Sequence, residues 1–418
     1  MSEKLIYVHL SLKQKSYFVG RLWCRAKDGR ESASFEYAQE WLNNSARFSL
    51  EPALALAKGT FHTNSEHAIF GAIGDSAPDR WGRVLMRRAE ISFAKEQKRT
   101  PKTLTESDYL LGVNDEARQG ALRFTETPGG KYLAETAVNS IPPLIELPKL
   151  LSASQHFLAS KENISDLKLL LAPGSSLGGA RPKASIIDKD KSLAIAKFPK
   201  KDDEYNTVLW EAVSLALAKD SKIDTPVWRV EKILGKDVLI VKRFDRNNKE
   251  RIPFLSAMSM LQAKDNESRS YLEIAYSLLE CGAFPKSDTK ELFRRIVFNI
   301  LISNTDDHLR NHGFLLESQK GWRLSPVYDV NPTPIQIKSR NLSLNINFND
   351  NAASLDTALS VIEELRIPLQ EAKSIIREVA SSIKNWRQTA KKFKLSDKEI
   401  DYMSSAFEHE ELEKAKKI

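Results

Sequence analysis

The hydrophobic pattern of this 418-residue chain changes near residue 256. Before that point, runs such as residues 5–10 alternate apolar and polar side chains, as strands do, and helical stretches lie between them. Beyond it, apolar residues recur mainly at helical spacing. Two short strand-like runs, 313–318 and 322–330, interrupt this region around a turn at Gly321. The order predicts an α/β (α+β) chain in two lobes, a mixed lobe followed by a mostly helical C-terminal one.

The length of the chain predicts more than one folding unit. Single hydrophobic cores stop growing below 418 residues, so we expect two or three units. The hydrophobic share of 41% and the charged share of 28% are those of a globular protein and argue against disorder. A cluster of prolines near residues 142–148 marks one boundary. The segments we expect are residues 1–135, 136–243 and 244–418.

Charge and cysteine content indicate which kind of partner and which cellular compartment we expect for the protein. Sixty-three Lys and Arg against 55 Asp and Glu leave a formal charge of +8, which favours an anionic partner such as nucleotide, nucleic acid or an acidic protein. The two cysteines, Cys24 and Cys281, are far apart, which suits a reducing compartment. The first residues lack the apolar core of a signal peptide, and no run of about 18 apolar residues occurs. We therefore expect a cytoplasmic protein without a membrane partner.

The strongest local feature is the stretch NTDDHLRN, residues 304–311. Asp306 and Asn311 have the D-x-x-x-x-N spacing of a kinase catalytic loop, in which the Asp accepts a proton from the attacking hydroxyl and the Asn amide oxygen ligates Mg²⁺. The two strand-like runs that follow return the chain to Asp329, a second candidate magnesium ligand. The spacing alone is also explained by capping and turns, in which Asp and Asn abound. The hairpin and the second Asp favour the kinase interpretation.

Adjacent glycines, Gly178 and Gly179, lie within the stretch SSLGGARPKAS, residues 175–185. Without a Cβ, their backbone N–H groups can approach a phosphate closely, and Arg181 and Lys183 add positive charge. The stretch matches neither the P-loop pattern nor the kinase glycine-rich pattern. Taken alone, the pair of glycines indicates a plain turn, so a phosphate loop here needs support from elsewhere in the chain.

Lys197 lies in a strand-like run, LAIAKF. Alternation places Leu193, Ile195 and Lys197 on one face, so the cation would follow two apolar residues into the interior. Such a burial is costly unless the charge is paired. A phosphate together with Glu211, on the predicted helix near 204–220, would pair it as a strand Lys and a helix Glu do in protein kinases. A solvated edge-strand Lys is the alternative, and the strand–helix–strand order favours the paired one.

Further residues are candidates for the rest of a nucleotide site. Backbone groups near Val241 and Arg243 are placed to bond an adenine edge, with Phe244 packing beside the ring. Phe244 is equally compatible with the hydrophobic core. His308 and His312 are four residues apart but have no third histidine nearby, so we assign His308 to the catalytic loop rather than to a metal pair.

Several stretches, taken in order, form a recognisable set. They are SSLGGARPKAS, LAIAKFP, VLIVKRFDR, and NTDDHLRNHGFLL followed by LSPVYDV, with a strand start and GDSAPDRWGR in the first 125 residues. Together they resemble the HipA family of toxin kinases over nearly the whole chain. The resemblance implies a bilobal protein-kinase-like core preceded by a small N-terminal β/α subdomain.

The resemblance also implies roles for individual residues. Asp306 would be the catalytic base, and Asn311 and Asp329 would bind Mg²⁺. Ser176, or the adjacent Ser175, would be autophosphorylated, which ejects the phosphate loop and silences the kinase. The ATP site that we expect comprises Gly178, Gly179, Ala180, Lys183, Lys197, Glu211, Val241, Arg243, Phe244, His308, Asn311 and Asp329.

The same resemblance implies partners. The usual one is a HipB-like helix-turn-helix antitoxin, which binds operator DNA as a dimer, and the basic surface would add phosphate contacts. Family targets include aminoacyl-tRNA synthetases. The chain departs from the pattern at Pro182, which removes one N–H from the phosphate loop, and at Asp307, a second carboxylate beside Asp306. We expect Asp307 to point away and the enzyme to be active, since no catalytic group is lost.

Two other functions stay open on the sequence. A small-molecule phosphotransferase shares the Asp-to-Asn spacing and would act on no protein target. A catalytically silent corepressor would only bridge an antitoxin and DNA, and it would neither bind nucleotide nor label itself with γ-labelled ATP.

Overall fold

The computed structural model describes residues 2–27, 29–133, 141–174, 179 and 181–418. The chain divides into two compact units. The first unit comprises Met1–Asp202 and Glu231–Leu255, and the second comprises Asp203–Val230 and Ser256–Ile418. Each unit is described by itself below. The three segments expected from the sequence remain a prediction.

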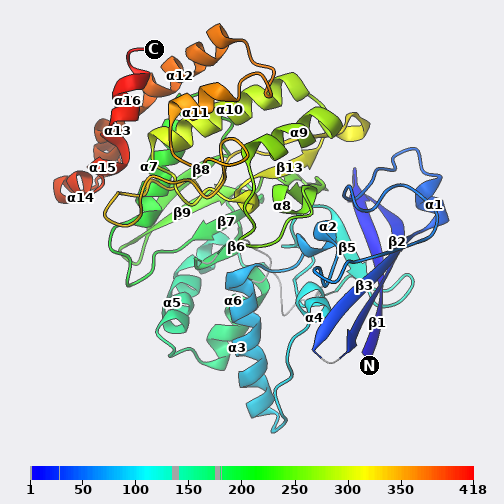
Figure 1. Ribbon diagram of the computed structural model, residues 1–418. Helices are drawn as coiled ribbons and strands as arrows, with labels where there is room; N and C mark the ends of the chain where they lie inside the picture. The colour runs from blue at the N-terminus through cyan, green and yellow to red at the C-terminus, as the bar shows by residue number, and fades with distance from the viewer. Residues whose placement is uncertain (1, 28, 134–140, 175–178, 180) are drawn as a thin grey trace. The chain divides into compact units, whose positions relative to one another are not determined.

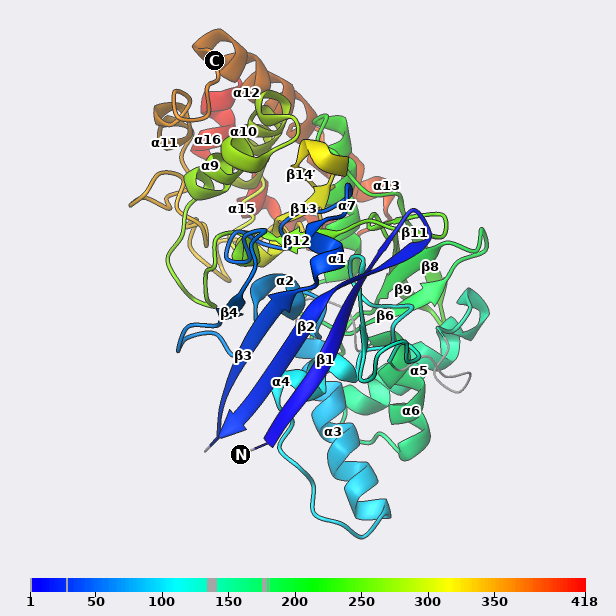
Figure 2. The same ribbon diagram turned by 90° about the vertical axis from the view of Figure 1, so that its right-hand side faces the viewer.

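The first unit opens with a five-stranded antiparallel sheet in the order β4-β3-β2-β1-β5 (Figure 2). Its strands are β1 (Ser2–Leu12), β2 (Lys15–Lys27), β3 (Arg30–Tyr37), β4 (Thr60–His62) and β5 (Leu122–Thr125). Alternate residues of β1, such as Ile6, Val8 and Leu10, are buried. This period-two burial forms because one face of the sheet is covered. The strand that alternation predicted over residues 5–10 is confirmed.

This unit also contains helices, some of which pack on a second sheet. They are α1 (Gln39–Leu42), α2 (Gly71–Gly74), α3 (Arg80–Glu96), α4 (Glu106–Leu111), α5 (Leu147–Leu158) and α6 (Ile164–Gly174), with the 3₁₀ turn η2 (Leu144–Glu146). Helix α3 starts at the N-cap Asp79, whose side chain accepts from the Arg80 N–H. Residues 64–70 form turns and bends before α2. In Figure 1, α3 and α6 lie next to each other, in agreement with the packing of one on the other.

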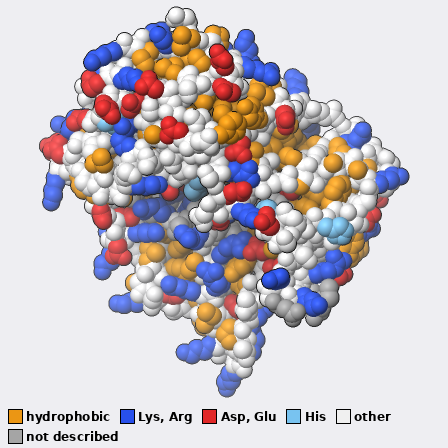
Figure 3. Space-filling view, viewed as in Figure 1, with side chains coloured by type: hydrophobic (Ala, Val, Ile, Leu, Met, Phe, Trp, Pro, Cys, Tyr) orange, Lys and Arg blue, Asp and Glu red, His pale blue; other side chains and the backbone are white. Residues whose placement is uncertain are grey.

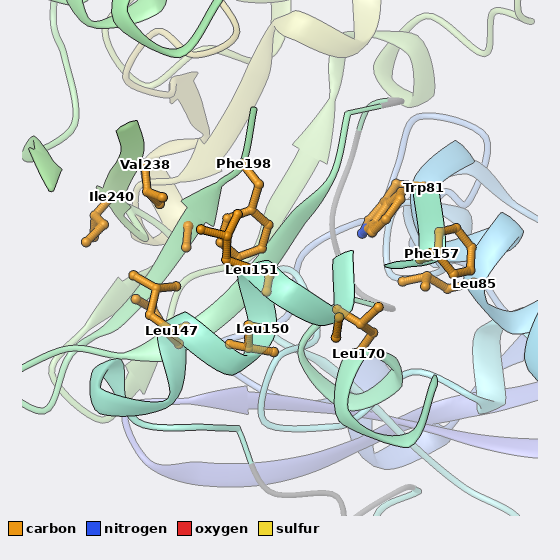
Figure 4. Packing of buried hydrophobic residues seen from close by; sticks show 14 of the residues in the cluster. Trp81, Leu85, Leu147, Leu150, Leu151, Phe157, Leu170, Phe198, Val238 and Ile240 are labelled. Carbon is orange, nitrogen blue, oxygen red and sulfur yellow. The ribbon is translucent and has the colours of Figure 1, made fainter. Parts of the chain in front are cut away.

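The second sheet has the strand order β6-β7-β9-β8. Its strands are β6 (Lys183–Ile187), β7 (Leu193–Lys197), β8 (Trp228–Ile233) and β9 (Lys236–Lys242). One face packs on α3, α5 and α6 through a core that Figure 4 shows from close by. Trp81 meets Phe157 edge to face there, with ring centroids 5.2 Å apart. Three short strands close the unit: β10 (Arg246–Asn247), β11 (Glu250–Arg251) and β12 (Phe254–Ser256), the last leading into the second unit.

The second unit is mainly helical and has α10 (Pro285–Leu301) at its centre. Helices packed against it include α9 (Tyr271–Cys281), α11 (Leu355–Ser360), α12 (Leu369–Ile383) and α16 (Glu410–Ala415). The remaining elements are α7 (Thr207–Asp220), α8 (Ala257–Met260), η3 (Leu309–Asn311), β13 (Gly313–Leu316), η4 (Ser318–Lys320), β14 (Trp322–Leu324), α13 (Trp386–Lys392), α14 (Asp397–Tyr402) and α15 (Ser404–Phe407). The predicted helical character beyond residue 256 is confirmed. No helix in the described ranges is long and apolar enough to cross a membrane.

Helix α7 belongs to the helical unit although it lies between two strands of the other unit in sequence. Its Trp210 is fully buried against Trp386 and Phe407, with ring centroids 6.2 and 6.0 Å away. Trp386 and Phe407 stack on each other at 4.5 Å. A helix that is apolar on nearly every side needs neighbours that cover nearly all of its surface. For α7, these neighbours include α12 and α13.

Candidate active site

The predicted catalytic loop begins where α10 ends. Ser303 adopts φ +51°, which stops the helix, and the loop then turns back. The carbonyl oxygen of Thr305 accepts two hydrogen bonds, from Lys338 Nζ at 2.8 Å and from Ser343 Oγ at 2.9 Å. The next residue, Asp306, is exposed. The loop is therefore anchored one residue before the predicted base, and the carboxylate itself is accessible to a substrate.

Asn311 is held against the backbone of the same loop. Its amide nitrogen Nδ2 donates to the carbonyl oxygen of Asp306 at 3.2 Å, and its backbone N–H donates to the carbonyl oxygen of His308 at 2.8 Å. Because the nitrogen of the amide faces Asp306, the oxygen Oδ1 is the atom that can ligate a cation. The five-residue spacing thus closes a small loop in which base and ligand are bonded to each other.

A hairpin brings Asp329 back toward this loop. Strands β13 and β14 pair antiparallel, with Phe314 opposite Leu324, which confirms two strands around Gly321. The second strand ends at Leu324 and does not extend to residue 330 as predicted. Gly321 adopts φ +115°, and a Cβ there would lie 2.3 Å from the carbonyl oxygen of Cys281, so glycine is required. The strand pair accounts for the return of the chain that the sequence predicted.

The residue before Asp329 is bonded to the residue before Asn311. The Tyr328 hydroxyl donates to the carbonyl oxygen of Arg310 at 2.7 Å. Asp329 itself is half-buried and has φ +55°, a left-handed conformation that Asp adopts more readily than most residues. The two predicted magnesium ligands therefore lie on backbone segments that are tied together, and a carboxylate with an amide oxygen is a donor set that suits Mg²⁺.

Asp307, next to the predicted base, has the opposite environment. Only 5% of it is exposed, and its Oδ2 accepts from Tyr271, Asn299 and His312. Burial by itself would raise the pKa of Asp307, but the facing His312 and the donated hydrogen bonds hold it below its usual value. The expectation that Asp307 points away from Asp306 is confirmed. Tyr271 was not foreseen because it lies 36 positions before Asp307. Asn299 lies close to the motif, but no sequence pattern marks it as a donor.

The two histidines of the loop differ in the same way. His308 is exposed and His312 is buried, so they do not form a pair facing one site. In the described part of the chain, no group of three or more His, Cys, Asp or Glu residues could hold a metal ion. The assignment of His308 to the cofactor site remains a prediction.

In the first unit, two predicted phosphate-binding lysines are brought together. Lys183 is not in a loop but is the first residue of β6, directly opposite Lys197 in β7. Like charges opposite each other destabilise a sheet, and an anion beside both would offset that cost. The main core lies on the other face of β7, through Ala194 and Ala196. Leu193, on the same face as half-buried Lys197, is buried in a smaller cluster with Ala117 and Ile141. The face predicted by alternation is therefore partly interior, although the helices cover the other face.

Gly179, from the predicted phosphate loop, is attached to the start of α3. Its N–H donates to Asp79 Oδ2 at 2.5 Å, and its carbonyl oxygen accepts from the Trp81 N–H at 3.1 Å. The Trp81 ring nitrogen donates to the carbonyl oxygen of Lys183 at 2.9 Å. The GDSAPDRWGR segment thus contacts Gly179 and the start of β6. Gly178, Ala180 and the candidate phosphorylation residues Ser175 and Ser176 lie outside the described residues.

The predicted adenine-binding residues are at the end of β9. Val241 is buried in the ladder with β7, and the Arg243 N–H already donates to the carbonyl oxygen of Leu193 at 3.0 Å. The Arg243 side chain is buried and bonded to Asp245. Arg243 therefore has a structural role in this unit. Its cofactor role, and those of Val241 and half-buried Phe244, remain predictions.

A family comparison covers the part of the chain that contains the catalytic loop and both lysines. The family model of the HipA-like C-terminal domain matches residues 175–387, just over half of the chain. The chain belongs to the HipA-like family. The matched range begins at the predicted phosphate loop and includes Lys197, Asp306 and Asp329.

Individual relatives of this HipA-like chain agree with that assignment. A Haemophilus influenzae protein whose name designates it a candidate kinase is 24% identical over 210 residues, which cover 44% of this chain and 61% of that protein. The chain thus spans less than two thirds of the length of this relative. The HipA structure from Shewanella oneidensis MR-1, solved with HipB and operator DNA, has a TM-score of 0.70 and 15% identity over 99% of both chains. This likeness confirms the predicted fold class.

A weaker structural likeness is to the Helicobacter pylori proinflammatory kinase CtkA. Its TM-score is 0.38, with 16% identity over 56% of this chain and 93% of that one. A score this low supports no argument about the HipA-like chain.

The HipA-like chain brings some predicted site residues together and keeps others in separate units. Asp306, Asn311 and Asp329 lie in the second unit on backbone segments joined by hydrogen bonds. Lys197 lies in the first unit, whereas Glu211, on α7, is buried in the second. The pairing of Lys197 with Glu211 therefore remains a prediction.

Proposed function

We propose that the chain is a Mg²⁺-dependent protein kinase that transfers the γ-phosphoryl group of ATP to a Ser or Thr hydroxyl. The observation that carries this proposal is the loop geometry: exposed Asp306 bonded through its carbonyl oxygen to Asn311, with Asp329 returned to the same loop. Membership of the HipA-like family over residues 175–387 supports it, because that range contains every proposed catalytic and phosphate-binding residue.

The proposed chemistry assigns each residue one task. The Asp306 carboxylate accepts the proton of the acceptor hydroxyl as its oxygen bonds to the γ-phosphorus and ADP leaves. Asn311 Oδ1 and the Asp329 carboxylate would hold Mg²⁺, which when bound neutralises charge on the phosphates. Lys183 and Lys197, opposite each other in β6 and β7, would contact phosphate oxygens.

Phosphoryl transfer from radiolabelled ATP tests the proposal. We expect Asp306→Asn to lower transfer by about a hundredfold or more while nucleotide affinity changes little, because only the proton acceptor is lost. Asp397→Asn, an exposed Asp at the start of α14, is the matched control and should transfer at the wild-type rate. Mass spectrometry of the same reaction should find phosphate on Ser176 or Ser175.

Full activity of Asp306→Asn would exclude Asp306 as the base. Absence of both nucleotide binding and self-labelling in the wild type would instead favour a silent corepressor. Transfer to a small molecule without any labelled protein would favour a small-molecule phosphotransferase.

The biological role that we propose is that of the toxin in a toxin–antitoxin pair. The whole-chain likeness to a HipA solved with HipB and operator DNA supports a helix-turn-helix antitoxin as partner and DNA contact through it. Figure 3 shows both positive and negative side chains on one face of the molecule. The contribution of basic side chains to phosphate contacts remains part of the proposal. The proposed target is a translation protein such as an aminoacyl-tRNA synthetase, and the proposed location is the cytoplasm. A short helix-turn-helix reading frame beside the gene, whose product co-purifies with this chain, would support the pairing.

A further inference from the structure

The carboxylate of Asp307 is held by three different parts of the second unit. Its Oδ2 accepts from the Tyr271 hydroxyl at 2.6 Å, from Asn299 Nδ2 at 2.8 Å and from His312 Nε2 at 2.8 Å. Tyr271 is the first residue of α9, Asn299 lies in the last turn of α10, and His312 follows η3. Every one of these side chains is buried. A buried carboxylate that receives three hydrogen bonds from packed elements has one allowed position.

The donors are also linked to each other and to the start of the loop. Asn299 Nδ2 lies 3.3 Å from the Tyr271 hydroxyl, and Asn299 Oδ1 accepts from Asn304 Nδ2 at 3.0 Å. The rings of Tyr271 and His312 meet edge to face, with centroids 5.7 Å apart. The network therefore reaches from Asn304, before the predicted base, to His312, after the predicted metal ligand. A shift of the loop would break bonds at both ends.

The proposed base is adjacent to the centre of this network. Asp306 and Asp307 share a peptide group, and the carbonyl oxygen of that group accepts from Asn311 Nδ2 at 3.2 Å. When the Asp307 carboxylate is fixed, the shared peptide is fixed, and with it the direction in which the exposed Asp306 points. Burial of Asp307 and exposure of Asp306 are two consequences of the same backbone turn.

We propose that Asp307, with Tyr271 and His312 as its donors, is a positioning residue that aims Asp306 and Asn311 for phosphoryl transfer. This inference rests on the proposed kinase function. It assigns a role to Asp307, which occupies an unspecified position in the D-x-x-x-x-N spacing. Catalysis depends on the orientation of the base because a misplacement of a catalytic group by about 1 Å can lower the rate on the order of a hundredfold.

Steady-state kinetics of two variants test the proposal. Tyr271→Phe removes one donor and Asp307→Asn removes the charge, and both keep the shape of the side chain. We expect kcat per nucleotide-binding molecule to fall on the order of tenfold for Tyr271→Phe and a hundredfold for Asp307→Asn, with KM for ATP within about twofold of wild type. A purely structural role would lower the bindable fraction or the melting temperature and leave kcat per binding molecule unchanged.

Two control variants distinguish an effect on the orientation of Asp306 from an effect on the stability of the unit. Tyr402→Phe removes a hydroxyl that donates to Glu204 at 3.1 Å, and Asp288→Asn alters a buried Asp that accepts from the Leu324 N–H at 3.2 Å. Both lie in the same unit but outside the loop network. We expect neither control to change kcat per nucleotide-binding molecule, even where Asp288→Asn lowers the melting temperature.

Amide hydrogen exchange tests whether the hydrogen-bond network fixes the loop, and this test does not require that the chain transfers phosphate. Peptides covering residues 302–314 should exchange faster in Tyr271→Phe and Asp307→Asn than in either control. Unchanged exchange of these peptides, or unchanged kcat in both variants of an active protein, would overturn the positioning role. The remaining outcome is that the wild-type protein transfers no phosphate while both variants still exchange faster than the controls. That outcome would support the network as the support of the loop and would refute the proposed kinase function.

Discussion

Glu51 is a carboxyl group buried at the N-terminus of α2, with 3% of its surface exposed. Its Oε2 accepts from the Ala72 N–H in the first turn of that helix. Burial raises the pKa of Glu51 to about 7, and the charge of Asp75 adds to the rise, against the opposing effect of the Ala72 bond. Between about pH 4.5 and 7 the folded chain keeps this proton while the unfolded chain loses it. Stability therefore falls as pH rises through that window.

The variant Glu51→Gln should remove this pH dependence. A glutamine oxygen can accept from Ala72 without any charge to bury, so the variant should be the more stable form above pH 7. From pH 5 to pH 8 we expect wild type to lose on the order of 2–3 kcal/mol relative to the variant. Urea unfolding midpoints of both proteins at the two pH values measure the difference. Parallel pH profiles would contradict the assigned pKa.

At the scale of elements, α16 is started by a histidine. His409 is the N-cap, and its Nδ1 accepts from the Leu412 N–H at 3.4 Å, while its Nε2 lies 3.2 Å from the carbonyl oxygen of Leu301. This arrangement requires a neutral ring with its hydrogen on Nε2. Burial lowers the pKa of His409 to about 4, and the charge of Arg340 lowers it further. Protonation would place a hydrogen where the cap needs an acceptor.

The sign of the expected pH effect follows from that lowered pKa. Between about pH 6.5 and 4 the unfolded chain binds a proton at this residue and the folded chain does not, so stability is lost as pH falls through the window. His409→Asn keeps a capping oxygen without a titratable ring. From pH 7 to pH 5 wild type should lose on the order of 2 kcal/mol relative to this variant. Melting temperatures at both pH values test it, and an equal loss in both proteins would refute it.

At the scale of the molecule, a buried ionic cluster joins distant segments of the first unit. Asp245 accepts from Arg243 Nε at 2.7 Å, from Arg246 at 2.8 Å and from the Gly120 N–H at 2.8 Å. Burial alone would raise the pKa of Asp245, but the two guanidinium groups hold it well below its usual value. Asp115 is placed in the same way between arginines from both segments. The cluster fastens the end of β9 to the region before β5.

Breaking this cluster should destabilise the whole unit. Asp245→Asn leaves two buried guanidinium groups short of a counter-charge, and we expect a loss of about 3–5 kcal/mol in unfolding free energy. Denaturant unfolding measures it, with limited proteolysis as a check on the 115–123 region. Asp190→Asn breaks the exposed ion pair with Lys242 and is the control, for which a small change is expected. Equal effects of the two substitutions would show that the cluster does not hold the unit together.

Local patterns in the sequence determined much of this protein. Alternation placed the first strand, and the turn at Gly321 placed the strand pair that returns Asp329. The spacing of Asp306 and Asn311 predicted a loop that their hydrogen bond now closes. These features depend on residues a few positions apart, where backbone geometry and side-chain reach leave few alternatives. For the same reason the motifs were sufficient to predict the fold class through the family they resemble.

Tertiary packing alone decided the rest. Nothing in the order of residues indicates that Tyr271, 36 positions before Asp307, donates to its carboxylate. Alternation identified two faces of β7, but the packing of α3, α5 and α6 decided that Lys197 lies opposite the core. Helix α7 reads as part of a strand–helix–strand unit, yet its apolar surface is buried among helices of the other unit. Burial is a sum over contacts between distant segments, so it determines the environment of each charged group only once the chain has folded.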